Sequence, residues 1–537
     1  MGMYLNSRVP QESFQAVRSG RYFVDKSKLL RELIPAVGTE ERFFCITRPR
    51  RFGKSVAANM VAAFFGNSGD GKHLFQGLEI EGCEGYQAHF MQHDVVFIDF
   101  SRIPRNCASY AQYMERIQDG LNDDFIQAYP EAGLDRSSAV WDNLQAIFER
   151  DRKKFFFVID EWDAPFHLDF VTERDKKDYL MFLRSLLKGQ AYVELAYMTG
   201  VLPIAKYSSG SELNMFLEFD IATAERFSRY FGFLDFEVDR LYKEYLKERK
   251  EPKISRKDLA KWYDGYYTAE GSKLYNPRSV VYALSNNQLR GYWTSSGPYD
   301  EVFYYIRHNI KDICGDLALM VSGEGIESRM LEYAATSKEL DTKDQIYSAM
   351  VVYGLLTYER ESGKVFIPNK ELMDKFHEML YANKGLGYIN RLARESTRML
   401  KATLSGDTQV MAEILKFTHD TESPIFSYNS EIELAAVVNL VYLAARDKYR
   451  VEREDKAGEG YVDFIFYPES RQADRMILEL KVDGTPEEAI QQIKDRKYAL
   501  RFLGKLGEEP KYTGRLLAVG ICYNKKTKEH RCKVEEL

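Results

Sequence analysis

Cysteine is scarce in this sequence, and its spacing excludes several classes of protein. Six cysteines are spread over 537 residues without a CxxC pair or a Cys/His cluster: Cys45, Cys83, Cys107, Cys314, Cys522 and Cys532. This pattern excludes a disulfide framework and a structural zinc site, and it favours a reducing compartment. The N-terminal residues show no basic segment followed by an apolar one, and no apolar run approaches the roughly 20 residues of a membrane span. We therefore expect a cytoplasmic protein without a membrane segment.

Excess charge of either sign is also missing. The formal net charge is -6, which excludes a wholly basic coating protein but leaves room for local basic patches on the surface. Hydrophobic residues make up 45% of the chain and charged residues 29%, as in globular proteins. Because 537 residues exceed one ordinary hydrophobic core, we expect two or three domains.

The first part of the chain alternates short apolar runs with longer amphipathic stretches. The apolar runs lie at 42–47, 94–100, 154–160 and 193–200. Short continuous apolar runs that alternate with helices are typical of a parallel sheet covered on both faces. We predict an α/β domain over residues 1–235.

The pattern changes after about residue 235. Charged and aromatic segments such as "DRLYKEYLKERKEP" indicate a mostly helical region over 236–405. From about residue 425 the order reads helix, strand, strand, helix, strand, and we assign 406–537 to a second α/β domain. Residues 461–468 and 476–482 flank a short polar segment, which predicts an antiparallel hairpin.

The segment "TRPRRFGKS" follows the first apolar run and precedes an apolar helix. A P-loop needs backbone N–H groups that face phosphate, a lysine that reaches the β- and γ-phosphates, and a hydroxyl that binds Mg²⁺. Lys54 and Ser55 supply the last two, while Arg48 stands where the usual first glycine would be. We predict that the nucleotide contacts the following residues: Arg51, Phe52, Gly53, Lys54, Ser55 and Val56.

A second motif, "KFFFVIDEWD", places two acids at the end of an apolar strand. In a Walker B element the first acid, here Asp160, holds Mg²⁺, and the second, here Glu161, polarises the attacking water. Thr199 ends the next strand and is either a γ-phosphate sensor or a turn residue. Lys206 is either a phosphate contact or a solvated lysine.

A third constellation lies on the predicted C-terminal hairpin. Glu479 and Lys481 are one residue apart on a strand, so both project from the same face. A turn near residue 472 brings Asp463 opposite them. Two carboxylates that hold a hard divalent cation beside a lysine suit phosphodiester hydrolysis. The alternative is two solvated acids and a lysine on an exposed strand.

Several strings in this chain resemble one family. They are "GRYFVDKSKLLREL", "ITRPRRFGKS", "VIDEWDAPF", "MTGVLPIAK", "YFGF", "KWYDGYYTAEGSKLYNPRSV" and "IPNKEL". In this order they resemble the bacterial AAA-ATPase-like family whose members end in a PD-(D/E)XK nuclease-like domain. The resemblance implies an AAA-like P-loop ATPase domain with a parallel sheet, a helical middle region and a C-terminal α/β nuclease-like domain. It also implies an association with mobile elements or phage defence.

The resemblance assigns further residues. Glu431 matches the family's helical glutamate, a metal ligand beside Asp463 and Glu479, with Glu433 as the competing choice. Gln492 falls where related nucleases place a glutamine near the active centre. Arg48, Arg50 and Arg51 surround the loop, where they either offset triphosphate charge, act across a subunit interface or pair with acids such as Glu40 and Glu41. Asp25 and Lys26 belong to the "VDK" motif, whose role at the nucleotide is open. For Trp262, Tyr263 and Asp264 we favour packing.

These assignments predict ATP and Mg²⁺ as cofactors, with Mn²⁺ as an alternative ion at the nuclease site. The predicted partner is nucleic acid, DNA rather than RNA, and a homo-oligomer is an open alternative. Basic residues after the acids form either a phosphate-tracking groove, with Tyr498 as a base-stacking candidate, or an ordinary solvated helix face: Lys494, Arg496, Lys497, Arg501 and Lys505. The leading hypothesis is an ATP-regulated endonuclease. The alternatives are an ATP switch that docks nucleic acid without cutting it, and a sensor or toxin-like effector whose nucleotide state controls oligomerisation.

Overall fold

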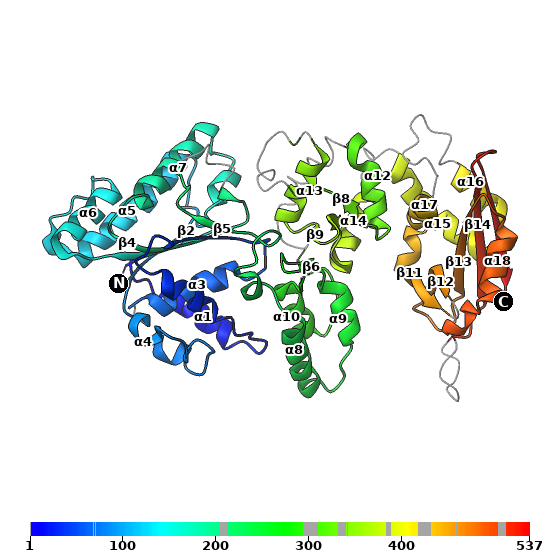
Figure 1. Ribbon diagram of the computed structural model, residues 1–537, viewed down its shortest axis with the longest axis horizontal. Helices are drawn as coiled ribbons and strands as arrows, with labels where there is room; N and C mark the ends of the chain where they lie inside the picture. Colours follow the sequence, from blue (N-terminus) through cyan, green and yellow to red (C-terminus); the bar gives the residue numbers. More distant parts are fainter. Residues whose placement is uncertain are drawn as a thin grey trace. The chain divides into compact units, whose positions relative to one another are not determined.

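A computed structural model of the chain separates into two compact units (Figure 1). The first comprises Met1–Pro298 and Glu327–Glu371, and the second comprises Tyr299–Ile326 and Leu372–Leu537. The chain therefore passes between the units three times, and these boundaries differ from those of the three predicted segments. The structure describes residues 2–67, 69, 71–204, 212–293, 310–330, 340, 342–382, 388–416, 431–457, 460–502 and 512–537.

A five-stranded sheet with the order β2-β3-β4-β1-β5 forms the centre of the first unit. Every pairing in it is parallel, as the apolar runs predict. The strands are β1 (Phe43–Thr47), β2 (Asp94–Asp99), β3 (Phe155–Asp160), β4 (Val193–Gly200) and β5 (Leu217–Phe219). The first four coincide with the predicted runs. The sequence analysis misses β5, a three-residue edge strand that is partly exposed and so lacks a continuous apolar pattern.

Helices cover both faces of this sheet (Figure 1). They are α1 (Val9–Arg18), α2 (Leu29–Leu33), α3 (Lys54–Phe65), α4 (Tyr86–His89), α5 (Tyr110–Ala128), α6 (Val140–Asp151) and α7 (Glu173–Leu187). Two hydrophobic clusters result, one under α5, α6 and α7 and the other under α1, α2 and α3. Alternate residues of each strand enter opposite clusters, for example Phe155 and Phe156, which explains the continuous apolar runs.

The remaining elements of the first unit are helices and short strands. They are α8 (Asp235–Glu248), α9 (Arg256–Tyr263), α10 (Pro277–Asn286), α13 (Lys343–Val352), β6 (Tyr266–Tyr267), β7 (Lys273–Leu274), β9 (Thr357–Glu359) and β10 (Lys364–Phe366). β6 pairs with β7, and β9 pairs with β10 next to β8 (Ile326–Glu327), where the chain enters the unit again. The middle of the chain is therefore mostly helical, as predicted, with small hairpins between its helices.

The second unit contains a mixed sheet with the order β11-β12-β13-β14-β15. Its strands are β11 (Tyr449–Ala457), β12 (Gly460–Pro468), β13 (Arg475–Val482), β14 (Leu516–Asn524) and β15 (Glu529–Glu536). The predicted hairpin is confirmed, because β12 and β13 pair antiparallel. The sequence analysis misses β11 and β15, the two edge strands, because charged residues interrupt their apolar pattern as is common at sheet edges.

Helices accompany this sheet in the second unit. They are α12 (Ile310–Val321), α14 (Lys370–Ala382), α15 (Tyr388–Ser405), α16 (Thr408–Lys416), α17 (Glu431–Val441) and α18 (Pro486–Asp495). α14 begins in the first unit and continues into the second, since the boundary follows Glu371. In the described part of the chain, no helix combines the length and apolarity that crossing a membrane requires.

Candidate nucleotide site and nuclease-like site

The loop that follows β1 has the backbone of an anion-binding turn. Arg51 and Gly53 have φ values of 72° and 92°, in the left-handed region that favours glycine. Alternation of right- and left-handed residues turns successive N–H groups toward one point. Helix α3 begins at Lys54, directly after Gly53, and adds the positive end of its dipole. Arg51, Phe52 and Gly53 therefore form a loop with two left-handed residues directly before the first turn of α3.

Lys54 closes over this loop from inside. Its buried ammonium donates hydrogen bonds to the carbonyl oxygens of Arg48 at 3.0 Å and Pro49 at 3.2 Å. Burial lowers the pKa of Lys54, and the charge of Glu161 opposes that shift. Lys54 thus lies across the loop at the N-terminal end of α3, where an anion would bind.

Arg48 does not face the pocket. Its side chain is 1% exposed, and Nη1 donates to the carbonyl oxygens of Thr47 at 2.8 Å and Phe219 at 2.7 Å. The guanidinium also lies over the ring of Phe231, 5.1 Å from its centroid. Burial lowers the pKa of Arg48 to about 10. The residue that replaces the usual glycine therefore anchors the loop to β5, whereas Arg50 and Arg51 line the pocket.

Asp160 ends β3 next to the loop and is 4% exposed. The hydroxyl of Thr199, at the end of β4, donates a hydrogen bond to its Oδ1. Burial raises the pKa of Asp160, and hydrogen bonds from the hydroxyls of Thr199 and Ser55 oppose that shift. The structure therefore brings Ser55, Asp160 and Thr199 together. Thr199 is fully buried and is not among the residues that line the pocket.

Glu161 follows Asp160 with φ of 51°, a left-handed conformation unusual for glutamate. This turn aims a half-buried carboxylate into the pocket beside Lys54. Burial raises the pKa of Glu161, and the charge of Lys54 lowers it. Strained residues of this kind concentrate at functional sites.

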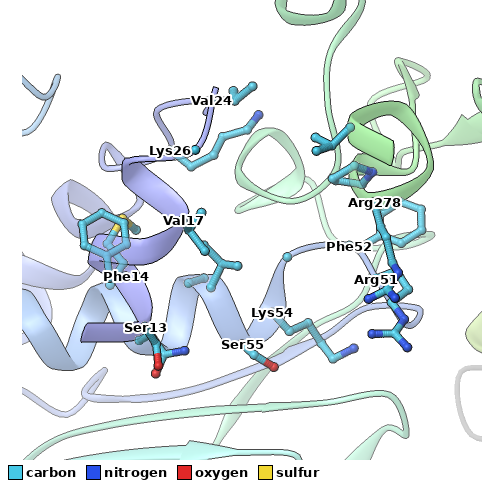
Figure 2. Close-up of a pocket in the computed structure, with 18 of the residues that line it drawn as sticks. Ser13, Phe14, Val17, Val24, Lys26, Arg51, Phe52, Lys54, Ser55 and Arg278 are labelled. Carbon is cyan, nitrogen blue, oxygen red and sulfur yellow. The ribbon is translucent and has the colours of Figure 1, made fainter. Parts of the chain in front are cut away.

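The pocket around these residues has a volume of about 930 Å³. Its walls come from the phosphate loop, from α1 with the following segment 20–26, and from α10. Figure 2 shows Lys54, Arg51 and Arg278 gathered on one side of the pocket, with Lys26 and Val24 across it. Arg278 lies on α10, in the predicted helical region, and the sequence analysis does not identify it.

Further pocket residues are missed because no motif marks them. Asp99 ends β2 directly beside Asp160 in the sheet register. It binds the hydroxyl of Ser101 at 2.6 Å and Nε of Arg102 at 3.0 Å. A single acid at a strand end is common, so only the position of β2 beside β3 reveals that Asp99 belongs to the site.

The "VDK" motif and the motif of Trp262, Tyr263 and Asp264 both make polar contacts within the first unit. Nζ of Lys26 donates to the carbonyl oxygen of Arg229 at 2.8 Å and to Glu237 at 2.7 Å, and Lys26 also lines the pocket. In the second motif, Tyr263 is buried and its hydroxyl donates to the carbonyl oxygen of Arg290 at 3.0 Å. Asp264 caps the end of α9. Lys206 lies outside the described residues.

In the second unit, the β12–β13 hairpin brings four of the predicted residues together. Oδ2 of Asp463 accepts the backbone N–H of Leu480 at 2.8 Å, which fixes the aspartate beside Glu479. Nζ of Lys481 lies 3.5 Å from Oε1 of Glu479. The amide of Gln492, on α18, donates a hydrogen bond to the same oxygen.

Glu479 is 3% exposed, and its Oε2 has no hydrogen-bond partner among the described residues. Burial, with the charge of Asp463, raises the pKa of Glu479 to about 8, while Lys481 opposes the shift. An orphaned buried carboxylate oxygen beside a second acid fits a divalent cation, which would satisfy both.

The third predicted acid is placed differently. Glu431 opens α17 and is exposed, whereas Glu433 is half-buried. Among the described residues, no group of three or more His, Cys, Asp or Glu side chains is arranged to hold a metal ion. The structure therefore pairs Asp463 with Glu479 but does not add Glu431 to them.

The basic segment after the acids is partly engaged in other contacts. Lys494 forms an ion pair with Glu535 at 2.6 Å. Tyr498 is fully buried in a hydrophobic cluster, so its ring is not available for the base stacking suggested by the sequence. Arg496 is exposed. Lys505 and the side chain of Arg501 lie outside the described residues.

Two family models match the chain. Residues 9–209 match a model described as a predicted AAA-ATPase, and residues 433–529 match the PD-(D/E)XK nuclease superfamily. The matches confirm the resemblance noted in the sequence. A curated relative, an uncharacterized protein in the vnfD 5′ region of Azotobacter chroococcum mcd 1, is 28% identical over 295 residues. That alignment covers 53% of this chain and 53% of the relative, so the chain spans about half of that protein's length.

Solved structures show weaker similarity. A Walker-type ATPase of Pyrococcus abyssi aligns with 65% of this chain and 94% of its own, at a TM-score of 0.35 and 11% identity. The ORC2 protein of Aeropyrum pernix aligns with 71% of this chain and 97% of its own chain, at a TM-score of 0.32 and 11% sequence identity. The domain assignment therefore depends on the family models and on the sheet topologies. Residues 9–209 resemble predicted AAA-ATPase domains, and residues 433–529 resemble domains of the PD-(D/E)XK nuclease superfamily.

Proposed function

We propose that the protein is an ATP-dependent nuclease that cleaves the phosphodiester backbone of nucleic acid, DNA in preference to RNA, with Mg²⁺ or Mn²⁺ as the metal. The observation that carries this proposal is the polar cluster on the β12–β13 hairpin. Asp463, Glu479 and Lys481 meet there at one face of the sheet, and Glu479 retains an unsatisfied buried oxygen.

The nucleotide site supports the ATP part of the proposal. Lys54 is positioned to exchange its two loop carbonyls for β- and γ-phosphate oxygens. Ser55 and Asp160 would hold Mg²⁺, which neutralises charge on the phosphates. In this role Thr199 orients Asp160 through its hydrogen bond and does not contact the γ-phosphate directly.

Hydrolysis of ATP is assigned to Glu161. Its carboxylate enters the pocket beyond Asp160, where it can accept a proton from a water molecule aligned with the γ-phosphate. Arg51, with Arg278 from α10, would balance the triphosphate charge on the opposite side. Because α10 contributes to the pocket, nucleotide binding would fix α10 against the loop.

At the nuclease-like site, Asp463 and Glu479 would hold the divalent ion that polarises the phosphate. Lys481 would orient the nucleophilic water or stabilise the charge that develops on phosphorus oxygens. Gln492 holds Glu479 in place from α18. A context in mobile-element maintenance or phage defence is consistent with this chemistry.

A cleavage assay tests the proposal. The full chain is incubated with supercoiled plasmid, linear duplex, single-stranded DNA or RNA, in Mg²⁺ or Mn²⁺, with and without ATP. Wild type and the exposed-site control Glu487→Gln should cut, whereas Glu479→Gln and Lys481→Ala should lose at least about a hundredfold in rate. Binding of nucleic acid without cleavage under every condition would contradict the nuclease proposal and favour an ATP-controlled nucleic-acid-binding protein.

A further inference from the structure

The outer side of the phosphate loop is held by residues that lie far along the chain. A Cβ atom on Gly354 would approach Cβ of Pro49 to 2.6 Å, so glycine at this position lets the loop pack closely. The ring of Phe52 meets Tyr266 edge-on, with centroids 4.8 Å apart. The indole N–H of Trp293 donates to the carbonyl oxygen of Arg50 at 2.9 Å. Three successive parts of the loop thus rest on the middle region of the chain.

Trp293 is itself held by a buried acid. Its backbone N–H donates to Oε1 of Glu371 at 2.6 Å, and the hydroxyl of Ser279 donates to Oε2 at 2.8 Å. Glu371 is 3% exposed, and Trp293 is also 3% exposed. Ser279 lies in the first turn of α10, the helix that carries Arg278 into the pocket. One carboxylate therefore joins Trp293, which supports the phosphate loop, to α10, the helix that brings Arg278 into the pocket beside that loop.

Glu371 lies at the boundary between the two compact units. It is the second residue of α14, and the boundary between the two compact units follows it directly. Leu372, Phe376 and Leu380, on the next turns of the same helix, are buried and belong to the second unit, which contains the nuclease-like domain. The carboxylate that supports the nucleotide loop thus sits at the start of a continuous helix leading into that unit.

We propose that Trp293 and Glu371 couple nucleotide binding to the nuclease-like unit, by linking the phosphate loop and α10 to the first turn of α14. The coupling rests on the proposed function of the loop as an ATP site. When the loop closes on phosphates, the Arg50 carbonyl and α10 are fixed together, and the hydrogen bonds of Trp293 and Glu371 pass that order to the first turn of α14. Trp293 and Glu371 are positioning residues, and neither contacts nucleotide.

Hydrogen exchange on the full chain tests the coupling, with MgATP as the ligand. The measured quantity is the exchange rate of α14 amides with and without saturating MgATP. In wild type, MgATP should slow this exchange by about fivefold or more. Trp293→Phe keeps an aromatic side chain but replaces the indole by a smaller ring and removes the N–H that reaches Arg50, and it should lose most of that slowing at MgATP concentrations that still saturate the site. Trp141→Phe, on α6 away from the loop, is the matched control and should behave as wild type.

The outcomes separate the coupling from the ATP assignment. MgATP binding to wild type without any change in α14 exchange would overturn the coupling and leave the ATP site intact. Unchanged slowing in Trp293→Phe would also overturn it. Failure of wild type to bind MgATP would remove the ATP site and the coupling with it. Glu371→Leu gives a second variant, expected to lose the α14 response and to weaken MgATP affinity about fivefold, because it removes the acceptors of both hydrogen bonds.

Discussion

The hydroxyl of Thr199 donates a hydrogen bond to the carboxylate of Asp160, across the parallel strands β4 and β3. Both side chains are buried, at 0% and 4% exposure. Burial favours the protonated form of Asp160, and this hydrogen bond favours the ionised form that binds metal. Thr199 therefore holds the direction of this acid and, together with Ser55, favours its ionised form.

Replacement of Thr199 tests this relationship. Thr199→Val keeps the shape of the side chain but removes the donor, so Asp160 loses a hydrogen bond to its ionised form. We expect MgATP affinity to fall about tenfold, since a hydrogen bond to a charged group contributes about 1.5–3 kcal/mol. Titration calorimetry measures the change, and Thr199→Ser should retain most of the affinity. Equal affinity in Thr199→Val and wild type would show that the hydroxyl has no part in metal–nucleotide binding.

We expect substitution of Arg48 to lower the stability of the fold, and substitution of Arg51 to weaken MgATP binding. Arg48→Ala removes two hydrogen bonds and the ring contact of a buried guanidinium, so we expect unfolding free energy to fall by about 3 kcal/mol. Arg51→Ala alters an exposed residue that lines the pocket, and it should weaken MgATP binding with a change below about 0.5 kcal/mol in stability. Chemical denaturation and nucleotide titration give the two readouts. A stable Arg48→Ala protein with weakened nucleotide binding would contradict the structural role of Arg48.

The sequence predicts the strands that carry the candidate site residues, because central strands and the β12–β13 hairpin keep a continuous apolar pattern. It also predicts Lys54, Asp160 and Glu479, since each stands in a motif with fixed spacing. Asp99 and Arg278 escape prediction because only the three-dimensional order of strands and helices brings them to the pocket.

Arg48 and Tyr498 show that the sequence does not predict whether a side chain faces the interior or the solvent. Both have the chemistry to bind phosphate or a base, but burial assigns them to the interior. A single sequence shows residue type and spacing, whereas the direction of a long side chain depends on tertiary packing. The same reason explains why Glu431 matches the family pattern but lies exposed at the start of α17.

The elevated pKa of Glu479, about 8, predicts a strong pH dependence of metal binding. A divalent ion needs the carboxylate form, so apparent Mn²⁺ affinity should rise about tenfold per pH unit up to about pH 8 and level off above it. Without metal, the folded protein instead favours the protonated form of Glu479. Because the folded pKa exceeds the usual 4.5, this group's contribution to stability is full below pH of about 4.5 and is lost as pH rises through 8.

Mn²⁺ titrations monitored by electron paramagnetic resonance between pH 6 and 9 measure this dependence. Glu479→Gln should bind the ion weakly and without the slope, while the exposed control Glu487→Gln should retain it. A pH-independent affinity in wild type would show that Glu479 does not ionise when the metal binds.

The most direct measurement for the whole account is the rate at which the full chain nicks supercoiled plasmid, with and without ATP, compared with Lys54→Ala. We expect ATP to change the wild-type rate about fivefold or more and to leave the Lys54→Ala rate unchanged, because the variant lacks the phosphate ligand. The exposed control Lys177→Ala should respond to ATP as wild type does. An equal ATP response in wild type and Lys54→Ala, or no nicking by wild type at all, would contradict an ATP-dependent nuclease.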